Sequence, residues 1–138
     1  MGSSVSQKGV HTSEAETRGV RISVTAKYSP ARSEPFRNRW FFLYTIKITN
    51  EGPETVQLVS RHWTITDGDN NLEEVKGLGV VGQQPTLEFG ESFEYTSGCP
   101  LQTPFGTMHG TYQMVTASGE EFDAKVAAFT LSEPYTVH

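Results

Sequence analysis

This sequence contains a single cysteine, Cys99, among its 138 residues. An intramolecular disulfide therefore cannot form, which is typical of a protein from a reducing compartment such as the cytoplasm. The sequence also lacks an apolar run of the roughly 20 residues that a membrane-spanning helix needs, and no signal peptide opens it. We therefore predict a cytoplasmic protein with no membrane partner.

Basic residues are also scarce, because 11 Lys and Arg stand against 16 Asp and Glu, which gives a net charge of -5 at pH 7. A net negative charge does not attract nucleic-acid phosphates over long range, so we expect no nucleic-acid partner. Aromatic residues make up 11% of the chain, a share that excludes a disordered polypeptide. A chain of this length forms one domain with a core of its own.

The first residues, Met1 to Arg18, lack apolar periodicity and are rich in Ser, Gly and charged side chains. This composition predicts a flexible N-terminal tail over residues 1–18. The folded domain is then expected to occupy residues 19–138.

From Val20 onward, apolar residues recur at every second position, as they do on a half-buried strand. Glycine and proline turns separate these segments, and no segment has the period of an amphipathic helix. The pattern predicts an all-β fold, an antiparallel β-sandwich of about seven strands of the fibronectin type III or immunoglobulin-like class. The expected strands cover residues 20–28, 40–49, 56–66, 72–75, 93–95, 108–115 and 122–131.

The alternation changes phase within residues 56–66, which indicates a β-bulge or a strand that changes sheets. The run Arg61, His62 and Trp63 follows this change. Two interpretations remain open for it. An exposed aromatic residue beside a cation would form a contact patch, whereas a buried Trp63 would be the core tryptophan of the sandwich.

Glycines at Gly77, Gly79 and Gly82 match the dinucleotide-binding pattern G-x-G-x-x-G. No helix is expected after them, so the strand–helix context of that motif is missing. One interpretation is a tight structural loop beside an interaction surface. The other is weak capture of phosphate or nucleotide by the loop amides, helped by Arg61 or Lys76.

The remaining polar clusters do not have the spacing of a metal or catalytic site. Asp67 begins a run that resembles a calcium loop, but Leu72 and Leu78 occupy the positions where that loop needs Gly and Glu. Cys99 and the histidines His62 and His109 lack any ligand spacing. We therefore predict no metal, no cofactor and no catalytic residues.

Several linked motifs resemble the ApaG family, and together they span about residues 20 to 135. The motifs are Ser60–Trp63 with Ile65–Asp67, Gly77–Pro85, Tyr95–Gly98, Thr103–Met114 and Ala128–Leu131. The resemblance implies a fibronectin III-like sandwich and an association with cobalt resistance and magnesium efflux. It also implies a protein-interaction role like that of the eukaryotic ApaG domains, and it supplies no catalytic residues.

The leading hypothesis is therefore a non-catalytic binding module for an unidentified protein partner. The alternative is a binder of phosphate or nucleotide, such as a diadenosine polyphosphate, through the glycine loop. A nucleotide hydrolase would need a carboxylate or histidine cluster, which the sequence does not supply. The candidate ligand-binding residues are Gly77, Gly79, Gly82, Arg61, His62 and Trp63.

Overall fold

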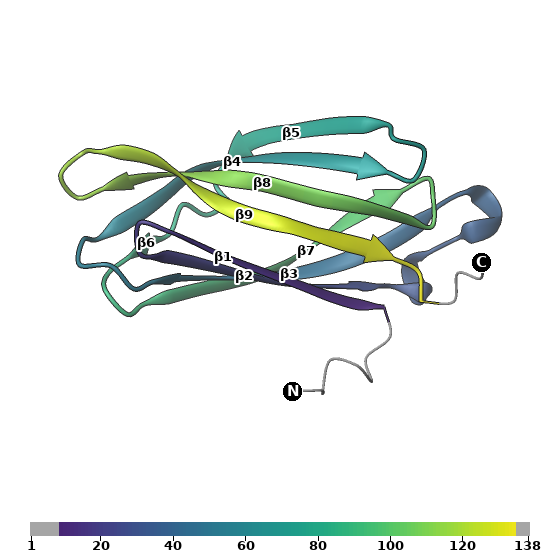
Figure 1. The fold of residues 1–138 in the computed structure, drawn as a ribbon, viewed down its shortest axis with the longest axis horizontal. Coiled ribbons are helices and arrows are strands. Elements are labelled where there is room, and N and C mark those ends of the chain that lie inside the picture. The colour runs from purple at the N-terminus through teal and green to yellow at the C-terminus, as the bar shows by residue number, and fades with distance from the viewer. Residues whose placement is uncertain (1–8, 135–138) are drawn as a thin grey trace.

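The computed structural model describes residues 9–134, which fold into two antiparallel β-sheets packed face to face (Figure 1). One sheet has the strand order β1-β2-β3-β7, and the other has the order β5-β4-β8-β9 with the short β6 beside β4. The predicted all-β antiparallel sandwich is thus confirmed. The strands are β1 Val10–Thr17, β2 Val20–Tyr28, β3 Trp40–Asn50, β4 Val56–Asp67, β5 Leu72–Leu78, β6 Thr86–Leu87, β7 Ser92–Leu101, β8 Phe105–Thr116 and β9 Glu121–Ser132.

The structure has nine strands in its described residues where the sequence predicted about seven. β1 is one of the additional strands, and it corrects the prediction of a flexible tail over residues 1–18. It pairs with β2 along its whole length, and Glu14 forms an ion pair with Arg21 on β2 at 2.7 Å. The strand was missed because its side chains are polar and backbone pairing holds it in place. Residues 1–8 of the predicted tail lie outside the described residues.

The core lies between the sheets and is built by the alternating apolar residues. Phe42, Ile46 and Ile48 of β3 are completely buried, as are Leu58 of β4 and Tyr112 of β8. These residues come from both sheets, so the period-two pattern placed the inward-facing side chains correctly.

The predicted change of phase is a β-bulge in β4. The register of β4 against β8 shifts between Leu58 and Ser60, so one residue of β4 is unpaired there. After the bulge, Arg61 and Trp63 share one face of the strand and His62 lies on the other. The bulge therefore decides which side chains of β4 turn toward the second sheet.

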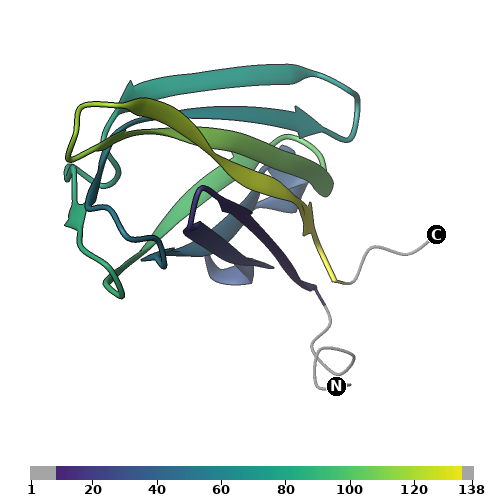
Figure 2. The ribbon, with the colours of Figure 1, turned by 60° about the vertical axis from the view of Figure 1, so that its left-hand side comes forward.

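The two lateral sides of the sandwich differ. On one side β9 lies beside β1, where the Ser13 hydroxyl donates a hydrogen bond to the Ala127 carbonyl at 2.9 Å (Figures 1 and 2). The Lys125 amide also donates to the Thr17 hydroxyl at 3.1 Å. On the other side β5 and β7 end their sheets, and no strand of residues 9–134 lies beyond them. We call the first the closed side and the second the open side.

Candidate functional site

The open side contains a pocket of about 320 Å³ between the two sheets. Its polar groups come from Arg61 of β4 and from Tyr44, Tyr95 and Ser97 on the facing sheet. The glycine loop forms a further wall of the pocket through Val80, Val81 and Gly82. We call this space the tyrosine pocket, and its lining residues are Tyr44, Arg61, Trp63, Leu78, Val80, Val81, Gly82, Tyr95 and Ser97.

Among the described residues that line the tyrosine pocket, Arg61 has the one charged side chain. Its Nη1 donates hydrogen bonds to the Leu78 carbonyl at 3.1 Å and to the Gly79 carbonyl at 2.8 Å. The guanidinium lies where a side chain at Gly77 would be, because a Cβ there would meet Nη2 at 3.0 Å. A side chain at position 77 would therefore push the guanidinium aside by a few tenths of an ångström.

The glycine loop is a tight turn. Val80 and Gln83 exchange backbone hydrogen bonds of 2.8 and 2.9 Å, and the Gly79 amide donates to the Val59 carbonyl at 2.8 Å. Gly82 has a φ of +79°, which glycine adopts without strain. Three of the loop amides thus bond to backbone carbonyls, so few N–H groups are left to converge on a phosphate.

Buried tyrosines supply the polar part of the pocket on the facing sheet. The Tyr95 and Tyr112 hydroxyls share a hydrogen bond of 2.5 Å. Burial raises the pKa of Tyr44, Tyr95 and Tyr112, so all three hydroxyls stay protonated near neutral pH. These tyrosines were not recognised as pocket residues from the sequence, because they share the phase of the inward-facing apolar residues of their strands. A buried tyrosine hydroxyl nevertheless needs a polar partner.

The structure separates the three residues of the Arg61–Trp63 run. Trp63 is only 3% exposed, and its ring packs against Tyr44 and Tyr112 at centroid distances of 5.8 and 6.0 Å. Trp63 is therefore a core residue, and its side chain also lines the tyrosine pocket. His62 turns to the outer face, where its Nε2 lies 3.0 Å from Glu74 Oε1. The run does not form one exposed aromatic and cationic patch.

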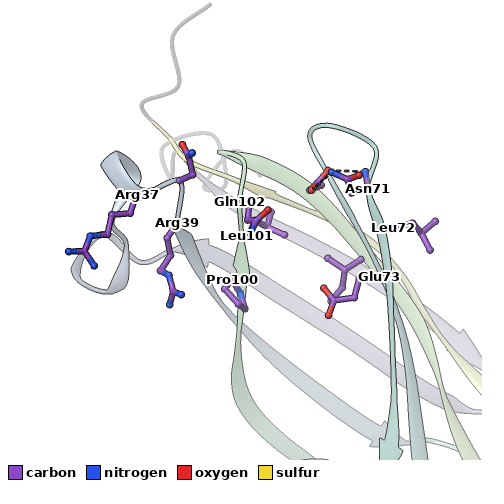
Figure 3. Close-up of a pocket in the computed structure, with 11 residues that line it drawn as sticks. Arg37, Arg39, Asn71, Leu72, Glu73, Pro100, Leu101 and Gln102 are labelled. Atoms are coloured by element: carbon purple, nitrogen blue, oxygen red, sulfur yellow. Dashed lines mark hydrogen bonds between the residues drawn. The ribbon is translucent and has the colours of Figure 1, made fainter.

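A second pocket, of about 460 Å³, opens at the end of the open side near the short 3₁₀ turn Pro35–Arg37 (Figure 3). Arg39 and Glu73 lie on opposite sides of Pro100 in this view, and Leu72 points away from the pocket. The residues that line this pocket come from segments far apart in the sequence, so no local sequence pattern indicates it.

Cys99 is buried, and Asp67 begins the turn between β4 and β5. Burial, and then the charge of Glu73, raise the pKa of the Cys99 thiol to about 12. The Asp67 carboxylate accepts N–H bonds from Asp69 and Asn71 at 2.8 and 2.9 Å, which lower its pKa and close the hairpin turn. Within residues 9–134 no three His, Cys, Asp or Glu side chains stand close enough to hold a metal ion.

β5 forms one of the two outer edges that the open side has within residues 9–134, and β7 forms the other. The Asp67 amide donates to the Asn71 carbonyl at one end of the β4–β5 ladder, and the Gly79 amide donates to the Val59 carbonyl at the other. Bonded pairs alternate in an antiparallel ladder, and the register joins Arg61 to Gly77. The residues that turn their N–H and C=O groups outward are therefore Leu72, Glu74, Lys76 and Leu78.

Comparison with known families identifies the chain's relatives. The model of the ApaG domain (DUF525) matches residues 30–116. The protein ApaG of Methylobacterium sp. (strain 4-46) is 57% identical over 122 residues, which are 88% of this chain and 94% of that protein. The protein ApaG of Bordetella pertussis is 54% identical over 117 residues, covering 85% and 89%.

This chain belongs to the ApaG family. The resemblance drawn from its motifs is confirmed. The solved structure of the putative ApaA protein from Bordetella pertussis superposes with a TM-score of 0.82 at 53% identity, covering 85% of this chain and 95% of that one.

Neither the family description nor the names of these relatives state an activity or a ligand. The C-terminal domain of wzt shares the fold with a TM-score of 0.53 at 10% identity, which shows the architecture alone. No helix within residues 9–134 is long and apolar enough to cross a bilayer.

Proposed function

We propose that this ApaG-family chain is a non-catalytic, cytoplasmic protein-interaction module that binds an extended segment of its partner along the outer edge of β5. One observation carries this proposal: Leu72, Glu74, Lys76 and Leu78 turn their backbone N–H and C=O groups away from β4, and of these groups the Leu78 carbonyl also accepts from Arg61. Such an edge can accept a further strand, whose main-chain hydrogen bonds supply affinity.

Exposed leucines at both ends of β5 support the same proposal. Leu72 is 62% exposed and Leu78 is 76% exposed, although both belong to a regular strand. Val81, in the adjacent loop, is 52% exposed. Apolar side chains on an uncovered strand edge favour contact with another protein, because pairing removes them from water.

The test compares two substitutions at one position. Lys76→Pro removes an outward N–H without breaking the β4–β5 ladder, whereas Lys76→Ala keeps that N–H and removes only the side chain. Tagged chains of both variants are used to capture proteins from a lysate of the source cells, after circular dichroism has shown that each variant is folded. A partner held by wild type and Lys76→Ala and lost with Lys76→Pro is the expected result. Equal recovery with all three chains would overturn the proposal.

A second candidate function is the binding of a small oxyanion in the tyrosine pocket. It is favoured by the position of Arg61, whose guanidinium reaches a pocket that no Asp or Glu lines. The protonated hydroxyls of Tyr44, Tyr95 and Ser97 add hydrogen-bond donors at the same place. The pocket volume of about 320 Å³ is near the lower limit of ligand sites, so a single phosphate or carboxylate group fits it better than a dinucleotide.

This candidate is tested by NMR titration with inorganic phosphate, phenyl phosphate and diadenosine tetraphosphate. Shifts at Arg61 and Ser97 with phenyl phosphate, lost in Arg61→Gln, are the expected result at roughly millimolar affinity, about -4 kcal/mol. Tight binding of diadenosine tetraphosphate confined to the amides of Gly77, Gly79 and Gly82 would instead favour a nucleotide site at the glycine loop. A role in cobalt resistance or magnesium efflux, which the resemblance implies, would then depend on the complexes that the module forms.

A further inference from the structure

We infer that the strand accepted by the β5 edge is β5 of a second copy of this chain, so that two sandwiches form a symmetric dimer with one continuous sheet. This inference rests on the proposed function, since it names the partner of the same edge. It is carried by the sequence of β5, Leu72-Glu73-Glu74-Val75-Lys76-Gly77-Leu78. This sequence is complementary to itself when two copies run antiparallel around Val75.

In that register the residue numbers of two facing residues add up to 150. Leu72 then lies opposite Leu78 of the second copy, and Glu74 lies opposite Lys76. The leucines are the two large exposed apolar residues of the strand, and the facing charges have opposite sign. Because a two-fold axis repeats every contact, the dimer gains two leucine pairs and two opposite-charge pairs.

The hydrogen-bond pattern permits this register. Two antiparallel strands join through residues whose backbone groups point toward each other, and in β5 these residues are Leu72, Glu74, Lys76 and Leu78. All four pair among themselves in the register centred on Val75, where the Leu78 carbonyl accepts both from Arg61 and, through its second lone pair, from the amide of Leu72 in the second copy. A register shifted by one residue would place outward-facing groups opposite inward-facing ones and would lose these hydrogen bonds.

The inner face of the strand adds a further match. Glu73 of the second copy would lie opposite Gly77, over which the guanidinium of Arg61 is held. Within residues 9–134, Arg61 donates to two carbonyls and takes part in none of the ion pairs. The dimer thus brings a carboxylate to this arginine, and it does not place like charges opposite each other on either face.

The other free edge does not share these properties. β7 contains Pro100, which has no N–H to donate to a neighbouring strand. Proline on an edge is a common protection against strand pairing. The dimer is therefore assigned to β5 and not to β7.

Analytical ultracentrifugation of the full chain at protein concentrations from about 1 µM to 1 mM tests the dimer. This range is chosen because an interface formed by one pair of edge strands is expected to be of moderate affinity. Wild type is expected to shift from monomer to dimer within this range. Glu74→Lys places Lys opposite Lys twice and is expected to raise the dissociation constant about tenfold. The double variant Glu74→Lys with Lys76→Glu restores opposite charges and is expected to return to within about threefold of wild type.

Rescue by the charge exchange is the decisive result, because a merely destabilised variant would not be rescued. Lys76→Pro is expected to remain monomeric, whereas Lys76→Ala keeps the backbone pairing and dimerises more weakly than wild type. A wild-type chain that stays monomeric throughout, or a dimer unaffected by Glu74→Lys and Lys76→Pro, would overturn the inference. Capture of a different protein that is lost with Lys76→Pro would then still uphold the proposed function.

Discussion

On the closed side of the sandwich β1 and β9 lie side by side and exchange side-chain hydrogen bonds, whereas on the open side β5 and β7 leave their outer edges uncovered. On the closed side, polar groups of β1 and β9 form hydrogen bonds with each other. The open side has exposed leucines, an arginine bound to carbonyls and pockets lined by residues of β4 and β5. The difference indicates that the closed side stabilises the fold, while the open side is available for binding.

The largest loss of stability is expected at Trp63, a buried residue that also lines the tyrosine pocket. Replacing Trp63 with Ala removes a ring that packs against Tyr44, Tyr112 and Phe129, and should lower the free energy of unfolding by about 3–5 kcal/mol. Urea denaturation followed by circular dichroism measures this loss. A stability close to that of wild type would mean that Trp63 belongs to a binding patch and not to the core.

A smaller loss is expected in the glycine loop. Gly79 has a φ of +63°, and a Cβ there would collide with the Gln83 carbonyl, so Gly79→Val should cost about 2–3 kcal/mol. The matched control is Gly82→Ala, since Gly82 also has a positive φ but has open space around it. Its expected cost is about 1 kcal/mol. Equal losses at both positions in urea denaturation would contradict the contact with Gln83.

The closed side should respond to removal of a single hydrogen bond. Ser13→Ala leaves the Ala127 carbonyl without its partner from β1, and the expected loss is about 1 kcal/mol. Thermal unfolding monitored by calorimetry at low protein concentration measures it. Unchanged stability would indicate that β1 contributes little to closing this side.

The smallest effect on stability is expected on the open side. Glu74 is exposed, so Glu74→Lys should change the free energy of unfolding of the monomer by no more than about 0.5 kcal/mol. Urea denaturation in dilute solution is the measurement. A loss of several kcal/mol would show that the outer face of β5 is part of the fold's own support and would remove the contrast between the two sides.

The sequence predicted the sandwich and the bulge in β4, because alternation depends on local spacing alone. It missed β1, whose strand is stabilised by pairing with β2 and not by burial of an apolar face. The strand positions of Arg61 and Trp63 were predictable, but their roles were not. Only the structure shows that one of them is core and the other holds the glycine loop.

The tyrosine pocket could not be predicted for a different reason. Tyr44, Tyr95 and Arg61 come from three strands of two sheets, and their approach depends on how the sheets pack. Gly77 was recognised as part of a nucleotide-like motif, yet its absent side chain makes room for a guanidinium. A glycine pattern indicates where the backbone or a neighbouring group needs space. It does not indicate which group occupies that space.

Hydrogen exchange of the β5 amides, followed by NMR at about 50 µM and 1 mM, tests most directly whether the open edge is the interaction surface. The predicted result is that the amides of Glu74 and Lys76 exchange quickly in the dilute sample and slowly in the concentrated one. The amides of Val75 and Gly77, which face β4, should be protected in both samples. Exchange at Glu74 and Lys76 that is equally fast at both concentrations would contradict pairing of the edge with a second copy.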